Sequence, residues 1–127
     1  MKLEISEIGR DGDLRLEVPV KLGSDSDRAT VYLNPKEPIT DAAKQRPYVQ
    51  QELRELAPFL RVPSFPKIGR VHNDFNDLVR LNTDVEFGSK SAMISLEGLP
   101  EELSIAGDEA IDLYVREKFE KLANQIL

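Results

Sequence analysis

The only histidine of the chain, His72, stands beside two carboxylates, Asp74 and Asp77. The spacing of Asp74 and Asp77 places them on one face of a helix, where His72 reaches them from the preceding loop. Such a group predicts a weak metal site or the acid–base pair of a hydrolase. Asparagine and aspartate are also ordinary helix caps, and the spacing matches no fixed metal motif. We therefore rank a His72-dependent hydrolase as the second alternative function and expect no metal site.

The residue types that most enzymes rely on are scarce. The chain contains no cysteine and no tryptophan, which excludes thiolate nucleophiles, cysteine-ligated metal centres and disulfides. The sequence contains no phosphate-cradling, dinucleotide-binding or serine-hydrolase motif. We therefore expect a protein without catalytic residues and without a cofactor.

Basic and aromatic side chains are interleaved in the segment 58–72, which contains no acidic residue. The candidate partner-binding residues of this basic loop are Arg61, Phe65, Lys67 and Arg70. Such residues suit protein hot spots, and they also suit phosphate contacts combined with base stacking. The plainest interpretation is a loop anchored by its phenylalanines, with its charges in water. Protein binding ranks next, and nucleic-acid binding third, because a net charge of −6 opposes attraction to phosphate.

The segment from Ser91 to Val115 contains acidic residues but no lysine or arginine. Glu101 and Glu102 lie in its irregular part, between a predicted strand and a predicted helix. A surface with one sign of charge steers an oppositely charged partner and speeds association. Capping and solubility explain the same acidic residues equally well. We include Glu101 and Glu102 among the candidate contacts to a basic protein.

Length and composition are those of one globular domain, residues 1–127. Acidic residues outnumber basic ones by 23 to 17, which favours solubility over contact with anionic membranes. The N-terminal residues do not resemble a signal peptide, and the sequence contains no apolar run that could cross a membrane. We therefore expect a cytoplasmic protein that does not bind membranes.

Alternating apolar residues predict strands. A first hairpin is expected over residues 2–22 with its turn at 9–13, a third strand over 29–33, and a second hairpin over 85–96. Proline cannot donate to a strand ladder, so Pro19 predicts that the strand 14–22 lies at a sheet edge or carries a bulge. An unguarded opposite edge would allow a homodimer or a partner to add strands.

Helical spacing predicts two main helices. The first is opened by Pro47, after a short helix capped by Thr40, and Pro58 ends or kinks it. Its buried stripe is Val49, Leu53, Leu56 and Leu60, and its outward residues are Gln50, Gln51, Glu52, Arg54 and Glu55. The C-terminal helix follows Asp108 and buries Ile111, Val115, Phe119, Leu122 and Ile126. Residues 58–73 are expected to form a long loop, and a short helix is expected from Asn73 or Asp74 to Leu81.

These elements predict an α+β fold, in which a mostly antiparallel sheet of about five strands carries the central and C-terminal helices. For function, we expect a small non-enzymatic protein that binds another protein. Inhibitors, immunity proteins, adaptors and phage or plasmid accessory subunits all work in this way. The first alternative is a nucleic-acid-binding module that uses the basic loop.

Overall fold

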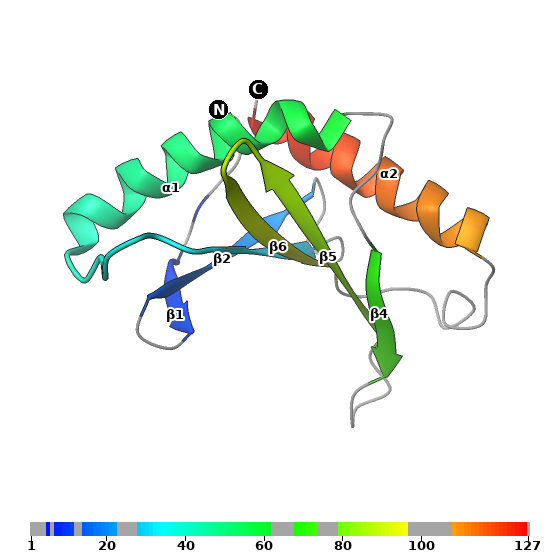
Figure 1. Cartoon of the computed structure of the whole chain (residues 1–127), viewed down its shortest axis with the longest axis horizontal. Coiled ribbons are helices and arrows are strands. Elements are labelled where there is room, and N and C mark those ends of the chain that lie inside the picture. Colours follow the sequence, from blue (N-terminus) through cyan, green and yellow to red (C-terminus); the bar gives the residue numbers. More distant parts are fainter. Residues whose placement is uncertain are drawn as a thin grey trace.

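The chain folds through two successive runs of three strands and a helix (Figure 1). The structure is a computed structural model that describes residues 5, 7–11, 14–22, 28–61, 68–73, 79–96 and 108–126. The first run comprises β1 (Gly9–Asp11), β2 (Arg15–Lys21), β3 (Arg28–Leu33) and α1 (Ala42–Leu56), followed by the 3-10 helix η1 (Ala57–Arg61). The second run comprises β4 (Ile68–Asn73), β5 (Val79–Phe87), β6 (Lys90–Leu96) and α2 (Asp108–Ile126).

Within the described residues, the strands form one six-stranded sheet in the order β1-β2-β3-β6-β5-β4. Every neighbouring pair is antiparallel. The two runs meet at the centre of the sheet, where β3 pairs with β6 and Val31 lies opposite Ile94. Both helices lie on the same side of the sheet (Figure 1). The predicted α+β fold is therefore confirmed, with β4 as the strand that the sequence pattern did not predict.

The hydrophobic core lies between this face of the sheet and the two helices. On β2, Leu16, Val18 and Val20 are buried, as their alternation predicts. The helical stripes belong to the same buried cluster: Val49, Leu53, Leu56 and Leu60 on α1 and η1, and Val115, Phe119, Leu122 and Ile126 on α2. Ile111, which was predicted to be buried with the α2 stripe, is only partly buried and packs against this cluster. Burying one such side chain fully contributes about 1.5–3 kcal/mol. The two stripes therefore fix both helices to the sheet.

Helix α1 begins earlier than the sequence pattern predicts. Asp41, not Thr40, is the N-cap, and its Oδ1 accepts a hydrogen bond from the Ala43 amide at 2.9 Å. Pro47 lies inside α1 instead of opening it, so the helix lacks the hydrogen bond that this residue would donate. Pro58 acts as predicted, because α1 ends shortly before it and η1 follows. None of the described helices is both long and apolar enough to cross a membrane.

The segment 58–73, predicted as a long loop, contains regular structure. Its beginning belongs to η1 and its end forms β4, while residues 62–67 lie outside the described part. The register of β4 with β5 shifts between Ile68 and Val71, and such an irregularity interrupts the alternation that reveals a strand. The short helix predicted up to Leu81 is also wrong at its end, because Val79 opens β5.

Pro19 predicted that its strand lies at a sheet edge or carries a bulge. Strand β2 is instead the second strand of the sheet, next to β1. The first hairpin is antiparallel, but β1 occupies residues 9–11, where the turn was expected. Because β1 pairs with β2 only as far as Glu17, Pro19 lies beyond its end and pairs with Thr30 of β3 on the other side. A missing N–H is tolerated there, since no described strand lies beside that part of β2.

Candidate functional site

The structure places two of the six predicted partner-binding residues. Arg61 is the last residue of η1, and its guanidinium donates a hydrogen bond to the Asn124 side chain on α2. Arg70 lies in β4, which was expected to be loop. The other four candidates, Phe65, Lys67, Glu101 and Glu102, lie outside the described residues. Whether the six side chains form one surface therefore stays a prediction.

His72 also lies in β4, with Arg80 of β5 as its cross-strand partner. Its proposed companions Asp74 and Asp77 lie outside the described residues. Among the residues that are described, no group of three or more histidine, aspartate or glutamate side chains is arranged to hold a metal ion. The acid–base interpretation of His72 remains untested.

A pocket of about 760 Å³ opens between three segments that are distant in the sequence. These segments are the connection after β3, the side of α1 that carries Tyr48 and Glu52, and the turn between β5 and β6. The residues that line it are Asn34, Pro35, Lys36, Glu37, Ile39, Tyr48, Glu52, Ser89, Lys90 and Ser91. We refer to it as the Lys90 pocket. Its volume falls in the range of about 300–1,000 Å³ that is typical of ligand sites.

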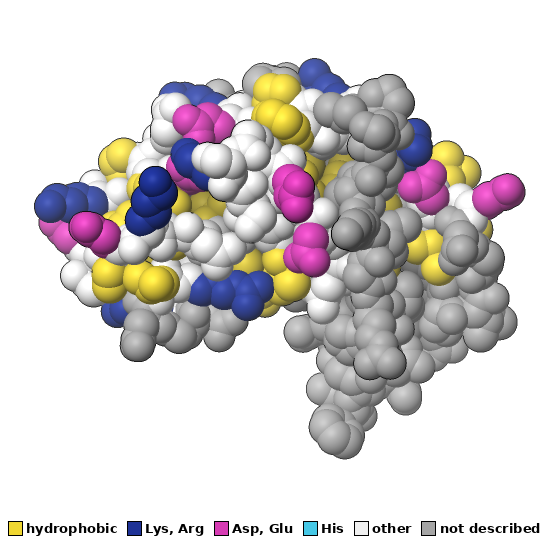
Figure 2. Space-filling view, viewed as in Figure 1, with side chains coloured by type: hydrophobic (Ala, Val, Ile, Leu, Met, Phe, Trp, Pro, Cys, Tyr) yellow, Lys and Arg dark blue, Asp and Glu magenta, His cyan; other side chains and the backbone are white. Residues whose placement is uncertain are grey.

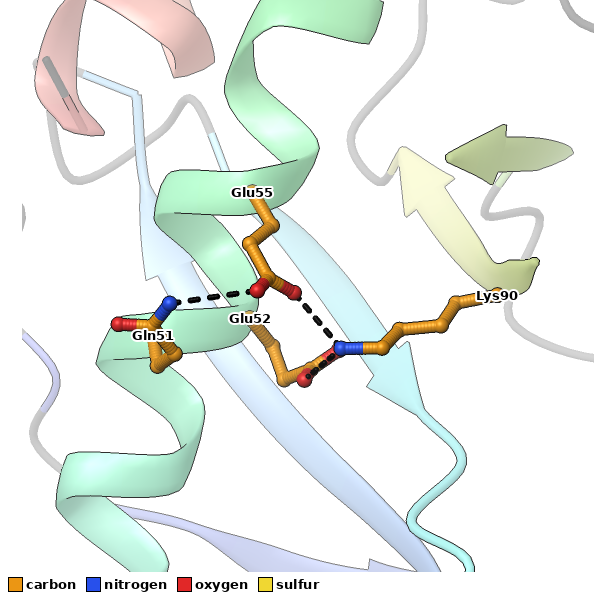
Figure 3. Close-up of polar contacts among 4 residues, drawn as sticks. All are labelled: Gln51, Glu52, Glu55 and Lys90. Atoms are coloured by element: carbon orange, nitrogen blue, oxygen red, sulfur yellow. Dashed lines mark hydrogen bonds and ion pairs between the residues drawn. The ribbon is translucent and has the colours of Figure 1, made fainter. Parts of the chain in front are cut away.

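The turn between β5 and β6 places Lys90 in this pocket. Phe87 pairs directly with Lys90, so Gly88 and Ser89 form a two-residue turn within the predicted second hairpin, and Lys90 opens β6. Gly88 has a φ of 69°, a backbone conformation that glycine adopts without a steric penalty. Figure 3 shows Lys90 extending from the hairpin toward α1.

Two carboxylates of α1 converge on the Lys90 ammonium (Figure 3). The Nζ atom lies 2.7 Å from Glu52 Oε1 and 2.7 Å from Glu55 Oε2. Gln51 Nε2 donates a further hydrogen bond of 3.2 Å to the other oxygen of Glu55. Glu52 is only 6% exposed, whereas the side chains of Lys90 and Glu55 are 44% and 41% exposed. The network therefore has one buried carboxylate and two members that reach the surface.

The contacts around the pocket shift three pKa values. Hydrogen bonds to Glu52 and then to Glu55 raise the pKa of Lys90 above its ordinary value of 10.5. Hydrogen bonds from Lys90 and then Gln51 lower the pKa of Glu55 below 4.5. Burial, followed by the charge of Glu52, raises the pKa of Tyr48 above 10.0. At pH 7 the ammonium and the Glu55 carboxylate are therefore charged, and the phenol is neutral.

Two hydrogen bonds hold the remaining wall of the pocket in place. Gln45 Nε2 on α1 donates to the Ile39 carbonyl at 2.7 Å, which ties the connection after β3 to the helix. Asn34 Nδ2 donates to the Ser91 carbonyl at 3.5 Å, linking the end of β3 to β6. The Asp41 cap fixes the start of α1 between these contacts. The pocket is therefore built from anchored segments.

Sequence analysis did not identify this pocket, and its prediction that Glu52 faces outward is wrong. At about 100° per residue, Glu52 lies about 60° from Val49 on the helical wheel, at the flank of the buried stripe. It also stands one helical turn from Tyr48, which lines the same pocket. The flanking position was visible in the sequence, but the lysine that meets Glu52 is 38 residues away.

Comparison with known proteins places this chain in no group. No protein-family model, no curated protein and no solved structure matches it.

Proposed function

We propose that this protein acts without catalysis, by binding another protein at the face that carries the Lys90 pocket. The ionisation of the pocket supports this proposal. A general acid or base needs a pKa near the working pH, whereas the pKa values of Lys90, Glu55 and Tyr48 all move away from neutrality. These groups can offer fixed charges and hydrogen bonds, which are the means of recognition rather than of proton transfer.

The pocket has features that a protein partner can use. It combines a half-buried aromatic residue, Tyr48, with a buried charge, Glu52, and exposed polar groups around them. Binding hot spots commonly consist of aromatic or charged anchors surrounded by groups that exclude water. The net charge of −6 favours association with a basic partner. An inhibitor or an adaptor would bind its target in this manner.

The nucleic-acid alternative receives less support from the described residues. The Arg61 guanidinium already donates to Asn124, which reduces its freedom to contact a phosphate. Figure 2 shows lysine and arginine interspersed with aspartate and glutamate on the described part of the face that it presents. A nucleic-acid-binding surface usually presents a continuous basic patch instead.

The proposal can be tested by capture and by direct binding measurements. The tagged chain is used to capture proteins at low salt from a lysate of its source organism, and each candidate is then purified. We expect a stoichiometric complex in calorimetry, with an affinity that falls as salt is raised. Absence of any stoichiometric complex, or turnover of a small molecule by the purified chain, would contradict the proposal.

A pair of variants with the same change of charge locates the contact. Ser89→Arg adds a long cationic side chain at the pocket, and Ala110→Arg adds the same side chain at an exposed position of α2. We expect Ser89→Arg to weaken the complex by at least roughly tenfold, equivalent to about 1.4 kcal/mol. Ala110→Arg should leave it unchanged. Equal effects of the two variants would place the contact elsewhere.

A further inference from the structure

We infer that the Lys90 pocket accepts an uncharged aromatic side chain of the protein partner, an inference that rests on the proposed function. The first argument is the balance of charge. The charged residues that line the pocket within the described part of the chain are two lysines and two glutamates, Lys36, Glu37, Glu52 and Lys90. A charge of either sign meets as many like charges as opposite ones, so the lining selects neither an anion nor a cation. A neutral side chain also loses less hydration on entry than an ion does.

The second argument is the arrangement of apolar and polar groups. The wall of the pocket is more apolar than polar. Pro35 is buried, and Ile39 and Tyr48 are half-buried, so with Glu52 they form the deeper part of the lining. The exposed lining residues are Asn34, Lys36, Glu37, Ser89, Lys90 and Ser91. In binding hot spots, the anchoring side chain of the partner fills a pocket of this kind, and the groups around it exclude water.

The third argument distinguishes an aromatic side chain from an aliphatic one. Both gain by leaving water for an apolar wall. An aromatic ring gains in addition from Lys90, which lines the pocket and is 44% exposed, because the face of a ring attracts an ammonium group. The same kind of contact occurs on α2, where Lys118 Nζ lies 5.2 Å from the centre of the Tyr114 ring. Tyr48 offers the incoming ring a second aromatic contact.

The test uses defined probes instead of the unknown partner. The tripeptide Ac-Gly-Phe-Gly-NH2 is titrated into the isotopically labelled chain, and amide chemical shifts are followed by NMR. We expect saturable shifts at Tyr48, Ser89, Lys90 and Ser91. A matched peptide with cyclohexylalanine in place of phenylalanine keeps the apolar ring but removes its aromatic character, and it should bind more weakly by roughly threefold. Equal affinities of the two peptides would overturn the inference.

Charged probes test the first argument. Matched peptides with arginine or glutamate at the central position should both bind more weakly than the phenylalanine peptide, because an ion gives up its hydration and finds no net attraction in the pocket. Tighter binding of either charged peptide at the same amides would also overturn the inference.

A pair of variants gives an independent measurement. Tyr48→Leu should weaken the phenylalanine peptide by roughly threefold, whereas Tyr114→Leu should leave it unchanged. Tyr114 is a matched control because it precedes Val115 in the buried stripe of α2 as Tyr48 precedes Val49 on α1, and both rings pack partly buried against the core. The spectrum of each variant shows whether it is folded. Equal weakening by the two variants would show that the peptide does not bind at this pocket.

The two proposals fail in different ways. If no peptide binds but the partner complex persists and remains sensitive to Ser89→Arg, only the aromatic inference is wrong. If the phenylalanine peptide binds but no stoichiometric protein complex exists, the proposed function is wrong and the pocket recognises a free aromatic molecule instead.

Discussion

Replacing Lys90 with methionine tests the role of the ion-pair network in stability. Methionine keeps much of the aliphatic stem but removes the ammonium that lies 2.7 Å from Glu52. Removing one member of a fully buried pair costs about 3–5 kcal/mol, because the other charge is left uncompensated. An exposed pair contributes only about 0.2–1 kcal/mol. Here the side chain of Glu52 is 8% exposed and that of Lys90 is 44% exposed, so we expect a loss of about 2 kcal/mol.

The free energy of unfolding is measured by urea denaturation at pH 7, with a thermal melt as a second readout. A loss of about 2 kcal/mol corresponds to a melting temperature lower by about 6–10 °C in a domain of this size. Lys44→Met is the control, because Lys44 is exposed near the start of α1, and it should change stability by less than about 0.5 kcal/mol.

The loss should depend on pH in a defined direction. Because the pKa of Glu55 is lowered, its contribution to folding stability is present above pH 4.5 and is lost as the pH falls through its folded-state pKa. Because the pKa of Lys90 is raised, its contribution to folding stability is present below pH 10.5 and is lost as the pH rises through its folded-state pKa. The difference between wild type and Lys90→Met should therefore be largest at about pH 6–9 and smaller at about pH 3.

A double variant identifies the cause of the loss. Adding Glu52→Gln to Lys90→Met removes the uncompensated charge, so the double variant should be more stable than Lys90→Met alone. Our reasoning is refuted if Lys90→Met unfolds within about 0.5 kcal/mol of the wild type at pH 7, or if its loss of stability at pH 3 is as large as at pH 7. It is also refuted if the double variant is less stable than Lys90→Met.

Three further substitutions test how the elements that carry the pocket are held. Asp41→Ala removes the cap on the Ala43 amide and should cost about 1 kcal/mol in urea denaturation; unchanged stability and amide exchange would show that the cap is dispensable. Gly88→Ala should cost about 1 kcal/mol through its φ of 69° alone, since no atom lies within 4 Å of the added methyl group; a thermal melt equal to wild type would contradict this. Phe119→Ala opens the core at a side chain that is 0% exposed and should cost about 3–5 kcal/mol; a loss below about 1 kcal/mol would mean that the helices repack around it.

The parts of the fold that were predicted correctly depend on local patterns. Alternation predicted the buried side of β2, and helical spacing predicted the buried stripes of α1 and α2. Local spacing also favours the ion pair between Asp112 and Arg116, four residues apart on α2, whose N–O distance is 2.9 Å. These features depend on residues a few positions apart, because the periods of a helix and a strand are set by the backbone.

The errors arise where tertiary contacts override local preference. Leu81 and Thr83 belong to one buried face of β5, but their neighbours resemble a short helix. The burial of the Thr83 hydroxyl is tolerated because it donates to the Ile94 carbonyl of β6 at 3.1 Å. That partner is known only when the sheet has formed. The shifted register of β4 likewise hides its strand pattern from sequence analysis.

The candidate site shows the same division. The sequence alone determined that α1 is amphipathic and that a turn with a glycine joins the strands of the second hairpin, because both follow from periodicity and turn chemistry. Only the tertiary structure decided that Lys90 meets Glu52 and Glu55, which lie 38 and 35 residues away along the chain. The reason is that the packing of α1 against the sheet, and not any local pattern, sets which side chains face the hairpin turn.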